Sequence, residues 1–171
     1  MIKDSGARRQ FYDADGNPMA VRDIQEGKGR CDLMPLDVVG AIYEEFSDDD
    51  GIGVSLIEIA DFQRTGEVIH LKAALERFTR YDSWSDMFLE VSKHFEEGAK
   101  KYSEGNWKLG INTKHYIDSG VRHYLKWLRG DTDEPHDRAF VWNILCCIWT
   151  CIHKPELNDY RKNEGGQDAQ N

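Results

Sequence analysis

The chain has 171 residues, enough for one domain with its own hydrophobic core, and 40% of them are hydrophobic while 31% are charged. This balance excludes a disordered chain. The net charge of −9 argues against a general nucleic-acid-binding protein, because such proteins need a positive surface to release counterions from phosphates. No apolar run approaches the roughly 18 residues of a membrane helix, and no hydrophobic signal region opens the chain. We therefore expect a cytoplasmic protein without a membrane partner.

The N-terminal residues 1–34 show no sustained period and are expected to form an irregular arm that packs on the domain. Within this arm, the turn residues of Asp13–Pro18 could close a small hairpin. A polar loop, Glu26–Asp32, follows, and Pro35 is expected to open a helix that runs to about Phe46.

Two shorter helices are predicted near 54–63 and 67–80, and this middle region is interpreted as packing material. A longer helix is predicted from about Trp84 to Tyr102. Its expected buried face follows the 3.6-residue period and consists of Trp84, Phe88, Val91, Phe95, Ala99 and Tyr102. A second, polar face of the same helix consists of Glu90, His94, Glu97 and Lys101.

The next predicted helix covers about 114–129 and ends at Gly130. Its expected buried residues are Ile117, Val121, Tyr124, Leu125 and Leu128. The last helix, 135–153, is apolar nearly all round and should be central to the core, while residues 155–171 form a polar tail. The predicted fold class is therefore all-α, a helical bundle over 35–154 with an irregular N-terminal segment.

Cysteine usage does not suggest a disulfide framework or a structural zinc site. Three of the four cysteines, Cys146, Cys147 and Cys151, lie in the apolar last helix, and Cys31 stands alone. No Cys-x-x-Cys pair and no histidine at zinc spacing accompanies them. We expect buried free thiols.

Several cations from different predicted elements could converge on an anion such as a phosphate chain. These candidates are Lys28, Arg30, Lys100, Lys101, Arg122, His123, Lys126 and Arg129. For any one of them, the favoured interpretation is a solvated helix face. Arg122 and His123 are favoured because they stand beside the buried face of their helix.

The acidic residues give a weaker signal for a metal. Glu90 and Glu97 lie two turns apart on one helix face and are the candidate Mg²⁺ ligands. Asp133 and Glu134 are interpreted as caps and dipole partners of the last helix.

Three further residues have two open interpretations each. Asn143 lies in an apolar stretch on the same face as His136, and its hydrogen-bond partners are either structural groups or the edge of a bound base. Tyr102 and Trp107 flank a glycine-containing loop, where they either stack on a base or cover the core.

Four blocks of sequence together resemble a largely phage-encoded family of dATP/dGTP diphosphohydrolases. The blocks are Glu26–Pro35, Gly98–Tyr102 with Asn106-Trp107, Val121–Leu125 with Trp127 and Gly130-Asp131, and His136 with Trp142-Asn143. The resemblance covers about 26–36 and 84–153, and residues from about 40 to 80 look like an insertion seen in longer members of the family. The resemblance implies an all-α nucleotide pyrophosphohydrolase akin to MazG-like enzymes, in which Mg²⁺ held by carboxylates helps to cut a nucleoside triphosphate to monophosphate and pyrophosphate. If a phage encodes the protein, the cytoplasm in question is that of a bacterial host.

Carried over by position, the resemblance implies a pocket. The implied pocket residues are Lys28, Arg30, Asp32, Lys101, Tyr102, Asn106, Trp107, Arg122, His123, His136 and Asn143. Lys126 is a further candidate ligand-binding residue, and catalytic roles are expected for Glu97, His123 and His136. The sequence departs from the expected pattern in two places. The acidic metal motif of MazG-like enzymes cannot be recognised, because Lys100 stands three positions after Glu97, where the motif has another glutamate. In the last helix, Ala139 stands where the family has a second histidine.

The leading hypothesis is accordingly a Mg²⁺-dependent deoxypurine nucleoside triphosphate diphosphohydrolase, expected to form a homo-oligomer. The alternative is a non-catalytic phage nucleotide sponge, an anti-defence protein that sequesters a cyclic or ADP-ribose-type signal of bacterial immunity. Such a sponge would keep a basic and aromatic pocket without needing the carboxylates. A third hypothesis is a purely structural helical module.

Overall fold

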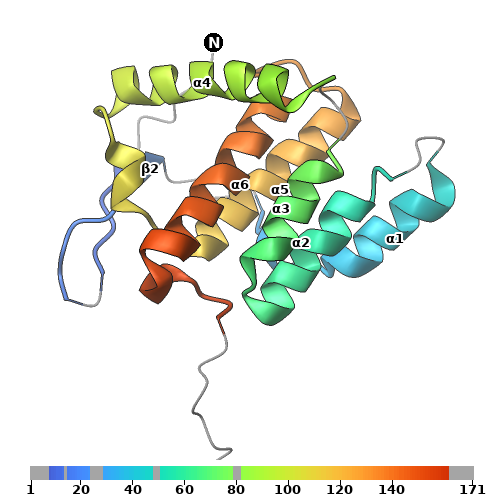
Figure 1. Cartoon of the computed structure of the whole chain (residues 1–171), viewed down its shortest axis with the longest axis horizontal. Helices are drawn as coiled ribbons and strands as arrows, with labels where there is room; N and C mark the ends of the chain where they lie inside the picture. The colour runs from blue at the N-terminus through green and yellow to red at the C-terminus, as the bar shows by residue number, and fades with distance from the viewer. Residues whose placement is uncertain (1–7, 14, 24–28, 48–50, 79–81, 162–171) are drawn as a thin grey trace, which may run out of the picture.

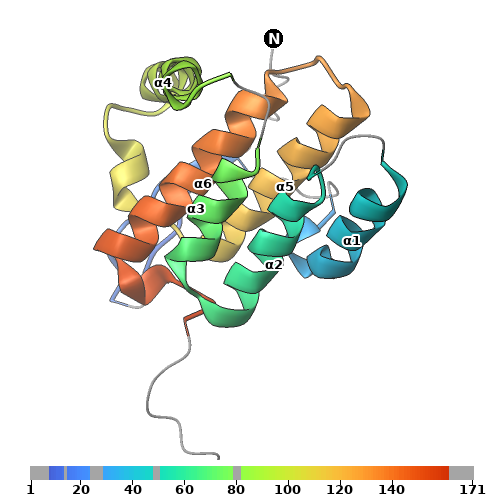
Figure 2. The ribbon, with the colours of Figure 1, turned by 45° about the vertical axis from the view of Figure 1, so that its right-hand side comes forward.

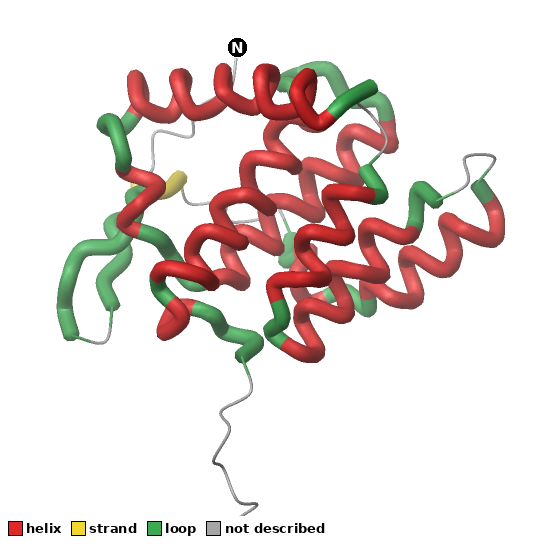
Figure 3. The backbone as a smooth tube through the Cα atoms, viewed as in Figure 1, coloured by secondary structure: helices red, strands yellow, loops and turns green. Residues whose placement is uncertain are grey.

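The computed structural model describes residues 8–13, 15–23, 29–47, 51–78 and 82–161 (Figures 1 and 3). Lys28, one of the predicted pocket residues, lies outside them. Six α-helices dominate this part of the chain: α1 (Leu36–Phe46), α2 (Val54–Thr65), α3 (Val68–Glu76), α4 (Trp84–Lys101), α5 (Thr113–Arg129) and α6 (His136–His153). The short elements are β1 (Arg8–Arg9), β2 (Arg22–Asp23) and the 3-10 turns η1 (Cys31–Leu33), η2 (Asn106–Leu109) and η3 (Pro155–Leu157). The all-α prediction is confirmed.

Helix α6 is the central element of the core, as its composition predicts. It packs along α5, contacts α3, and is crossed by α4 near one end (Figures 1 and 2). Phe140, Val141, Ile144 and Cys147 are fully buried. At Gly120 of α5 the two helices pack closely, since an added Cβ would be in ordinary van der Waals contact, at 3.4–3.5 Å, with side chains of α6.

Helices α1 and α2 form a second tight pair. A Cβ added to Gly40 would lie 2.6 Å from the carbonyl oxygen of Gly53, so the two backbones touch where the pair crosses. This contact covers one side of α1 only. Its opposite side leaves Val38, Ile42 and Phe46 exposed.

The predicted buried face of α4 is wrong at its N-terminal end. Trp84 and Phe88 are 51% and 46% exposed, whereas Met87 and Val91 are buried. Figure 2 shows the reason, since α4 is seen nearly end-on and lies across the bundle instead of along it. A crossing helix covers a narrower stripe than a parallel one, so only part of its amphipathic face finds a partner.

The predicted hairpin in the N-terminal arm is confirmed. Strands β1 and β2 pair antiparallel, and Tyr12 bridges Pro18. The carboxylate of Asp13 accepts hydrogen bonds from the backbone N–H groups of Asp15 and Asn17, which is the usual way an aspartate closes a turn. Beyond the turn, Ala20 donates its backbone N–H to the carbonyl of Gly110 and so ties the arm to the helical body.

The segment after α6 packs against the bundle as far as residue 161. Leu157 is buried, and Tyr160 meets Phe62 edge-to-face with ring centroids 5.4 Å apart. Asp159 accepts from the backbone N–H of Lys114 at 2.9 Å and from the Thr113 hydroxyl at 3.4 Å. This carboxylate therefore satisfies the first turn of α5, whose own N-cap residue makes no side-chain cap.

Candidate functional site

Two histidines and a glutamate converge where α5 passes the start of α6. The Nδ1 atoms of His123 and His136 lie 3.0 Å apart. Oε1 of Glu134 lies 3.5 Å from the Nδ1 atom of each histidine. His136 is buried, while His123 and Glu134 are partly buried, so one side of the group faces solvent. We call His123, Glu134 and His136 the His-Glu-His cluster.

Asp133 extends this cluster outward. Its Oδ1 atom lies 2.7 Å from Nε2 of His136, and its Oδ2 atom lies 3.3 Å from Nζ of Lys126. The hydrogen bond from His136 is the main cause that lowers the pKa of Asp133 to about 2. The carboxylate is therefore ionised at neutral pH, and as an acceptor it requires a proton on Nε2 of His136.

The interpretation of Asp133 and Glu134 as helix caps is wrong. The N-cap residue of α6 is Pro135, and it makes no side-chain cap. Both carboxylates instead contact histidine side chains. Carboxylates just before a helix can satisfy its free N–H groups or turn toward other partners, and sequence position alone does not distinguish the two arrangements.

The geometry of the cluster matches three corners of a tetrahedral metal centre. With metal–ligand bonds of about 2.0–2.1 Å, ligand atoms of a tetrahedral ion stand roughly 3.3 Å apart, close to the observed separations of 3.0 and 3.5 Å. Asp133 also fits this picture, because metal-binding histidines commonly donate their second N–H to a carboxylate. Imidazole and carboxylate donors together suit Mn²⁺, Co²⁺ or Zn²⁺. The residues present therefore fit a divalent metal ion.

A cavity of about 730 Å³ opens beside the cluster. It is lined by Cys31, Tyr43, Arg122, Leu125, Lys126, Leu128 and Arg129. Lys126 joins it to the cluster through its ion pair with Asp133. Three cations from successive turns of α5 and an apolar wall thus share one space, which is the combination that a nucleotide requires.

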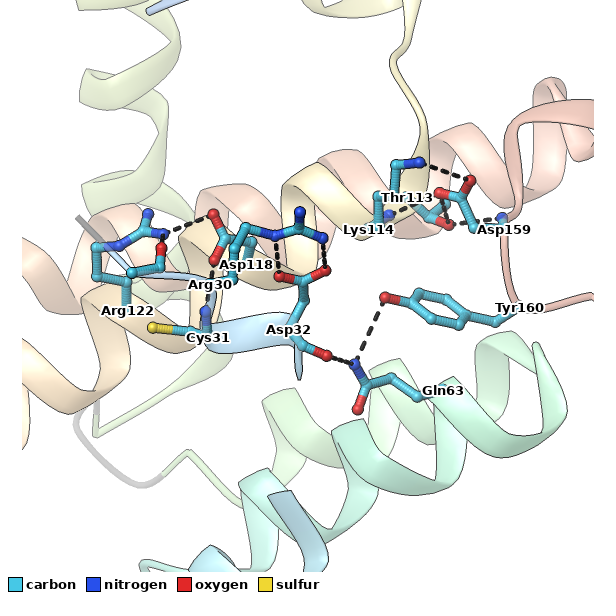
Figure 4. A network of polar contacts seen from close by, with 11 residues as sticks. Arg30, Cys31, Asp32, Gln63, Thr113, Lys114, Asp118, Arg122, Asp159 and Tyr160 are labelled. Carbon is cyan, nitrogen blue, oxygen red and sulfur yellow. Dashed lines mark hydrogen bonds and ion pairs between the residues drawn. The ribbon is translucent and has the colours of Figure 1, made fainter. Parts of the chain in front are cut away.

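The loop before α1 is held against α5 at the edge of this cavity (Figure 4). Asp118 accepts from the backbone N–H of Cys31 at 2.7 Å and from Nη2 of Arg122 at 2.6 Å. Arg122 also donates to the carbonyl of Gly29 at 2.9 Å. The side chains of α5 therefore fix both the path of this loop and the position of Arg122.

Arg30 and Asp32 form a forked ion pair within the same loop. Nε and Nη2 of Arg30 lie 2.7 and 2.6 Å from the two oxygens of Asp32, and this pairing raises the pKa of Arg30. From α2, Gln63 donates to the carbonyl of Asp32 at 2.7 Å and lies 3.5 Å from the hydroxyl of Tyr160 (Figure 4). Asp32 is thus a buried anchor, while the guanidinium of Arg30 remains largely exposed.

Several predicted site residues lie away from this cavity and have structural contacts. Glu97 accepts from Arg138 at 2.7 Å, and Glu90 pairs with Lys93 of its own helix. Within the described residues, neither glutamate belongs to a group of three potential metal ligands. Lys101 lies over the ring of Tyr102, with Nζ 5.3 Å from the centroid, at the end of α4.

Three further predicted site residues make contacts that stabilise the fold. Asn106 accepts from the backbone N–H of Val21 at 3.2 Å and so anchors the N-terminal arm. Trp107 meets Phe95 and Trp149 edge-to-face and covers the core. Asn143 donates to the carbonyl of Ala139 at 2.8 Å. This contact agrees with the structural interpretation of Asn143, in which its hydrogen-bond partner is a group of the protein itself.

The sequence interpretation assigns no site role to three participants, Asp118, Asp133 and Glu134. For Asp118 a signal exists, since it stands four residues before Arg122, the spacing of a helical ion pair. For Asp133 and Glu134 the signal is the pair of acids next to His136. This pair indicates a metal site only when the structure shows that α5 places His123 next to His136.

Comparison with known proteins identifies the family. A family model described as dATP/dGTP diphosphohydrolase, N-terminal, matches residues 70–160, more than half of the chain and all of the His-Glu-His cluster. No curated protein and no solved structure matches the chain. No helix in the described part of the chain is long and apolar enough to cross a membrane. The match confirms the family suggested by the four sequence blocks: the chain belongs to the dATP/dGTP diphosphohydrolase N-terminal family.

Proposed function

We propose that this protein hydrolyses a deoxypurine nucleoside triphosphate to its monophosphate and pyrophosphate, using a divalent metal ion held by the His-Glu-His cluster. The observation that carries the proposal is the set of three donor atoms 3.0–3.5 Å apart beside a cavity lined by cations. Family membership supports a nucleotide as the substrate. The identity of the base as a deoxypurine, the reaction products and the use of a metal are our proposals.

Arg122, Lys126 and Arg129 would face the triphosphate. Arg122 is already oriented by Asp118 and by the carbonyl of Gly29, so binding a phosphate costs it little side-chain entropy. Arg129, which also lines the cavity, is paired with Asp131. Tyr43, Leu125 and Leu128 offer an apolar wall for the base.

His136 would act as a metal ligand through Nδ1. Because Nε2 carries the proton donated to Asp133, Nδ1 has the free electron pair in the neutral ring. This Nδ1 lies 3.0 Å from Nδ1 of His123 and accepts a hydrogen bond from it. Metal binding at both Nδ1 atoms would require the other neutral tautomer of His123, with its proton on Nε2, so the hydrogen bond between the two rings would be lost without net proton release.

A divalent ion in the cluster would lower the pKa of a water ligand and polarise the phosphate. Glu134 would balance the ion's charge as a carboxylate ligand. Lys126, between the cavity and Asp133, would hold the leaving pyrophosphate. The water oxygen would bond to the α-phosphorus, the bond from that phosphorus to the bridging oxygen would break, and the proton lost by the water would pass to solvent. Mg²⁺, which prefers oxygen ligands, would then enter with the triphosphate.

The test is hydrolysis of dGTP and dATP by the full chain, with Mg²⁺, Mn²⁺ or neither, after treatment with a chelator. Chromatography should show metal-dependent monophosphate and pyrophosphate, and His136→Ala should lower the rate by about 100-fold or more. His153→Ala, which removes an exposed histidine at the opposite end of α6, is the matched control. Intact nucleotide recovered after tight binding would overturn hydrolysis and favour a sponge.

A further inference from the structure

A second group of potential metal ligands lies on α2 and α3, outside the site described above. Within the described residues, the ligand atoms of Glu58, Asp61 and His70 lie within 4.8 Å of one another. Nδ1 of His70 is 2.9 Å from Oε2 of Glu58. All three residues are partly buried, with 23%, 24% and 36% of the side chains of His70, Glu58 and Asp61 exposed. The interpretation of residues 40–80 as packing material overlooks this group.

The turn between α2 and α3 holds these ligands in place. Gly66 has φ +73° and ends α2, and its carbonyl accepts from Nδ2 of Asn158 at 2.9 Å. The hydroxyl of Thr65 donates to the carbonyl of Asp61 at 2.8 Å. A Cβ on Gly66 would lie 2.6 Å from the backbone of Arg161, so the C-terminal segment closes over the turn. The two helices are therefore fixed relative to each other before any ligand binds.

We propose that Glu58, Asp61 and His70 bind a first-row transition-metal ion of the Zn²⁺ class. Two carboxylates and one imidazole provide three protein ligands, and solvent access leaves a fourth position for water, as in exchangeable zinc sites. The two carboxylates supply the negative charge that compensates the ion. The site lies mainly outside the residues matched by the family model, and it does not rest on the proposed nucleotide chemistry.

One neighbouring cation competes with the metal. Nη2 of Arg64 lies 2.8 Å from Oδ1 of Asp61, and the Arg64 side chain is 66% exposed, so it can turn into solvent when an ion binds. Removing this cation should strengthen metal binding. If Glu58 and His70 served only as an ion pair between α2 and α3, the Arg64→Ala variant would not bind metal more tightly. This variant therefore separates a metal site from a purely structural ion pair.

The experiment uses Co²⁺ as the probe in the full-length His136→Ala variant, which disables the first cluster. Calorimetry should give one Co²⁺ per chain, with an absorption spectrum of nitrogen and oxygen ligands and no thiolate band. Adding His70→Ala should weaken binding by at least tenfold, adding Arg64→Ala should tighten it several-fold, and adding His153→Ala should change nothing. Zn²⁺ should displace the Co²⁺, and both metals should raise the melting temperature of the His136→Ala protein.

Absence of Co²⁺ binding in the His136→Ala protein would overturn the proposal, and so would unchanged affinity after His70→Ala in a folded protein. His70→Ala alone is expected to retain nucleotide hydrolysis. If His70→Ala loses Co²⁺ binding but keeps hydrolysis, the result concerns only the site on α2 and α3. If His136→Ala loses hydrolysis, the result concerns only the proposed function.

Discussion

The backbone N–H of Cys31 donates a 2.7 Å hydrogen bond to Oδ1 of Asp118, 87 positions later in the chain. The other oxygen of Asp118 binds Arg122, so one carboxylate fixes both the loop and a cation at the cavity. Asp118 and Arg122 are mostly buried, with 15% and 11% of their side chains exposed. Asp118 is thus a positioning residue that would act through Arg122.

Asp118→Asn should impair nucleotide binding more than the chemical step. The amide oxygen can still accept from Cys31, but the charge that holds Arg122 is lost. We expect KM to rise about tenfold, which corresponds to about 1.4 kcal/mol, with a smaller change in kcat. Stability should fall by about 1–3 kcal/mol, the range for a lost hydrogen bond to a charged group. Steady-state kinetics and urea unfolding measure the two effects, with the exposed Asp37→Asn as the control. An unchanged KM in the folded variant would refute this role.

Cys31 offers a direct probe of the cavity. It lines the cavity and is partly exposed, whereas the other three cysteines are buried free thiols, as the sequence predicts. A thiol reagent should therefore label one cysteine per native chain. Burial raises the pKa of the Cys31 thiol above its ordinary value of 9.0, so the labelling rate should still be rising beyond pH 9.

Nucleotide should protect this thiol if it occupies the cavity. At about ten times its Kd, roughly one cavity in ten stays empty, so labelling should slow about tenfold. Mass spectrometry of the labelled peptides locates the modification, and Cys31→Ser should abolish it. Labelling that proceeds at the same rate with saturating nucleotide would place the ligand elsewhere.

Much of the fold follows from local sequence patterns. The last helix is apolar on nearly all sides and is indeed central, and Gly130, in the left-handed conformation at φ +82°, ends α5 where predicted. The exposed face of α4 could not be predicted in this way. Trp84 and Phe88 satisfy the helical period, but the angle at which α4 crosses α6 decides which apolar residues find a partner.

The sequence predicts only part of the candidate site. It singles out four of the residues that the structure brings together, His123, His136, Arg122 and Lys126. Glu134 becomes recognisable as a ligand only when its 3.5 Å distances to two histidines from different helices are known. Such convergence depends on tertiary packing, which no spacing within one helix can show.

The carboxyl group of Asp133 should titrate at about pH 2 in the folded protein. Because this pKa lies below the ordinary 3.8, ionised Asp133 stabilises the fold above about pH 4, and that contribution disappears as the pH falls through about 2. His136→Ala removes the main hydrogen bond and should raise the pKa toward 3.8. Carbon-detected NMR of the carboxyl group measures both midpoints. Lys126→Met should give a smaller rise, and equal midpoints in the wild type and His136→Ala would contradict the assigned contact.

Gly66 should tolerate substitution far less well than Gly130, although both end a helix with positive φ, at +73° and +82°. In either glycine, alanine must adopt the left-handed conformation at a cost of about 1–2 kcal/mol. At Gly66 the new Cβ also meets the backbone of Tyr160 and Arg161 at 2.6 Å, whereas nothing lies within 4 Å at Gly130. Moving that segment should add about 1–3 kcal/mol, so urea unfolding should show Gly66→Ala as clearly less stable than Gly130→Ala. Equal losses would mean that residues 155–161 do not pack over the α2–α3 turn in solution.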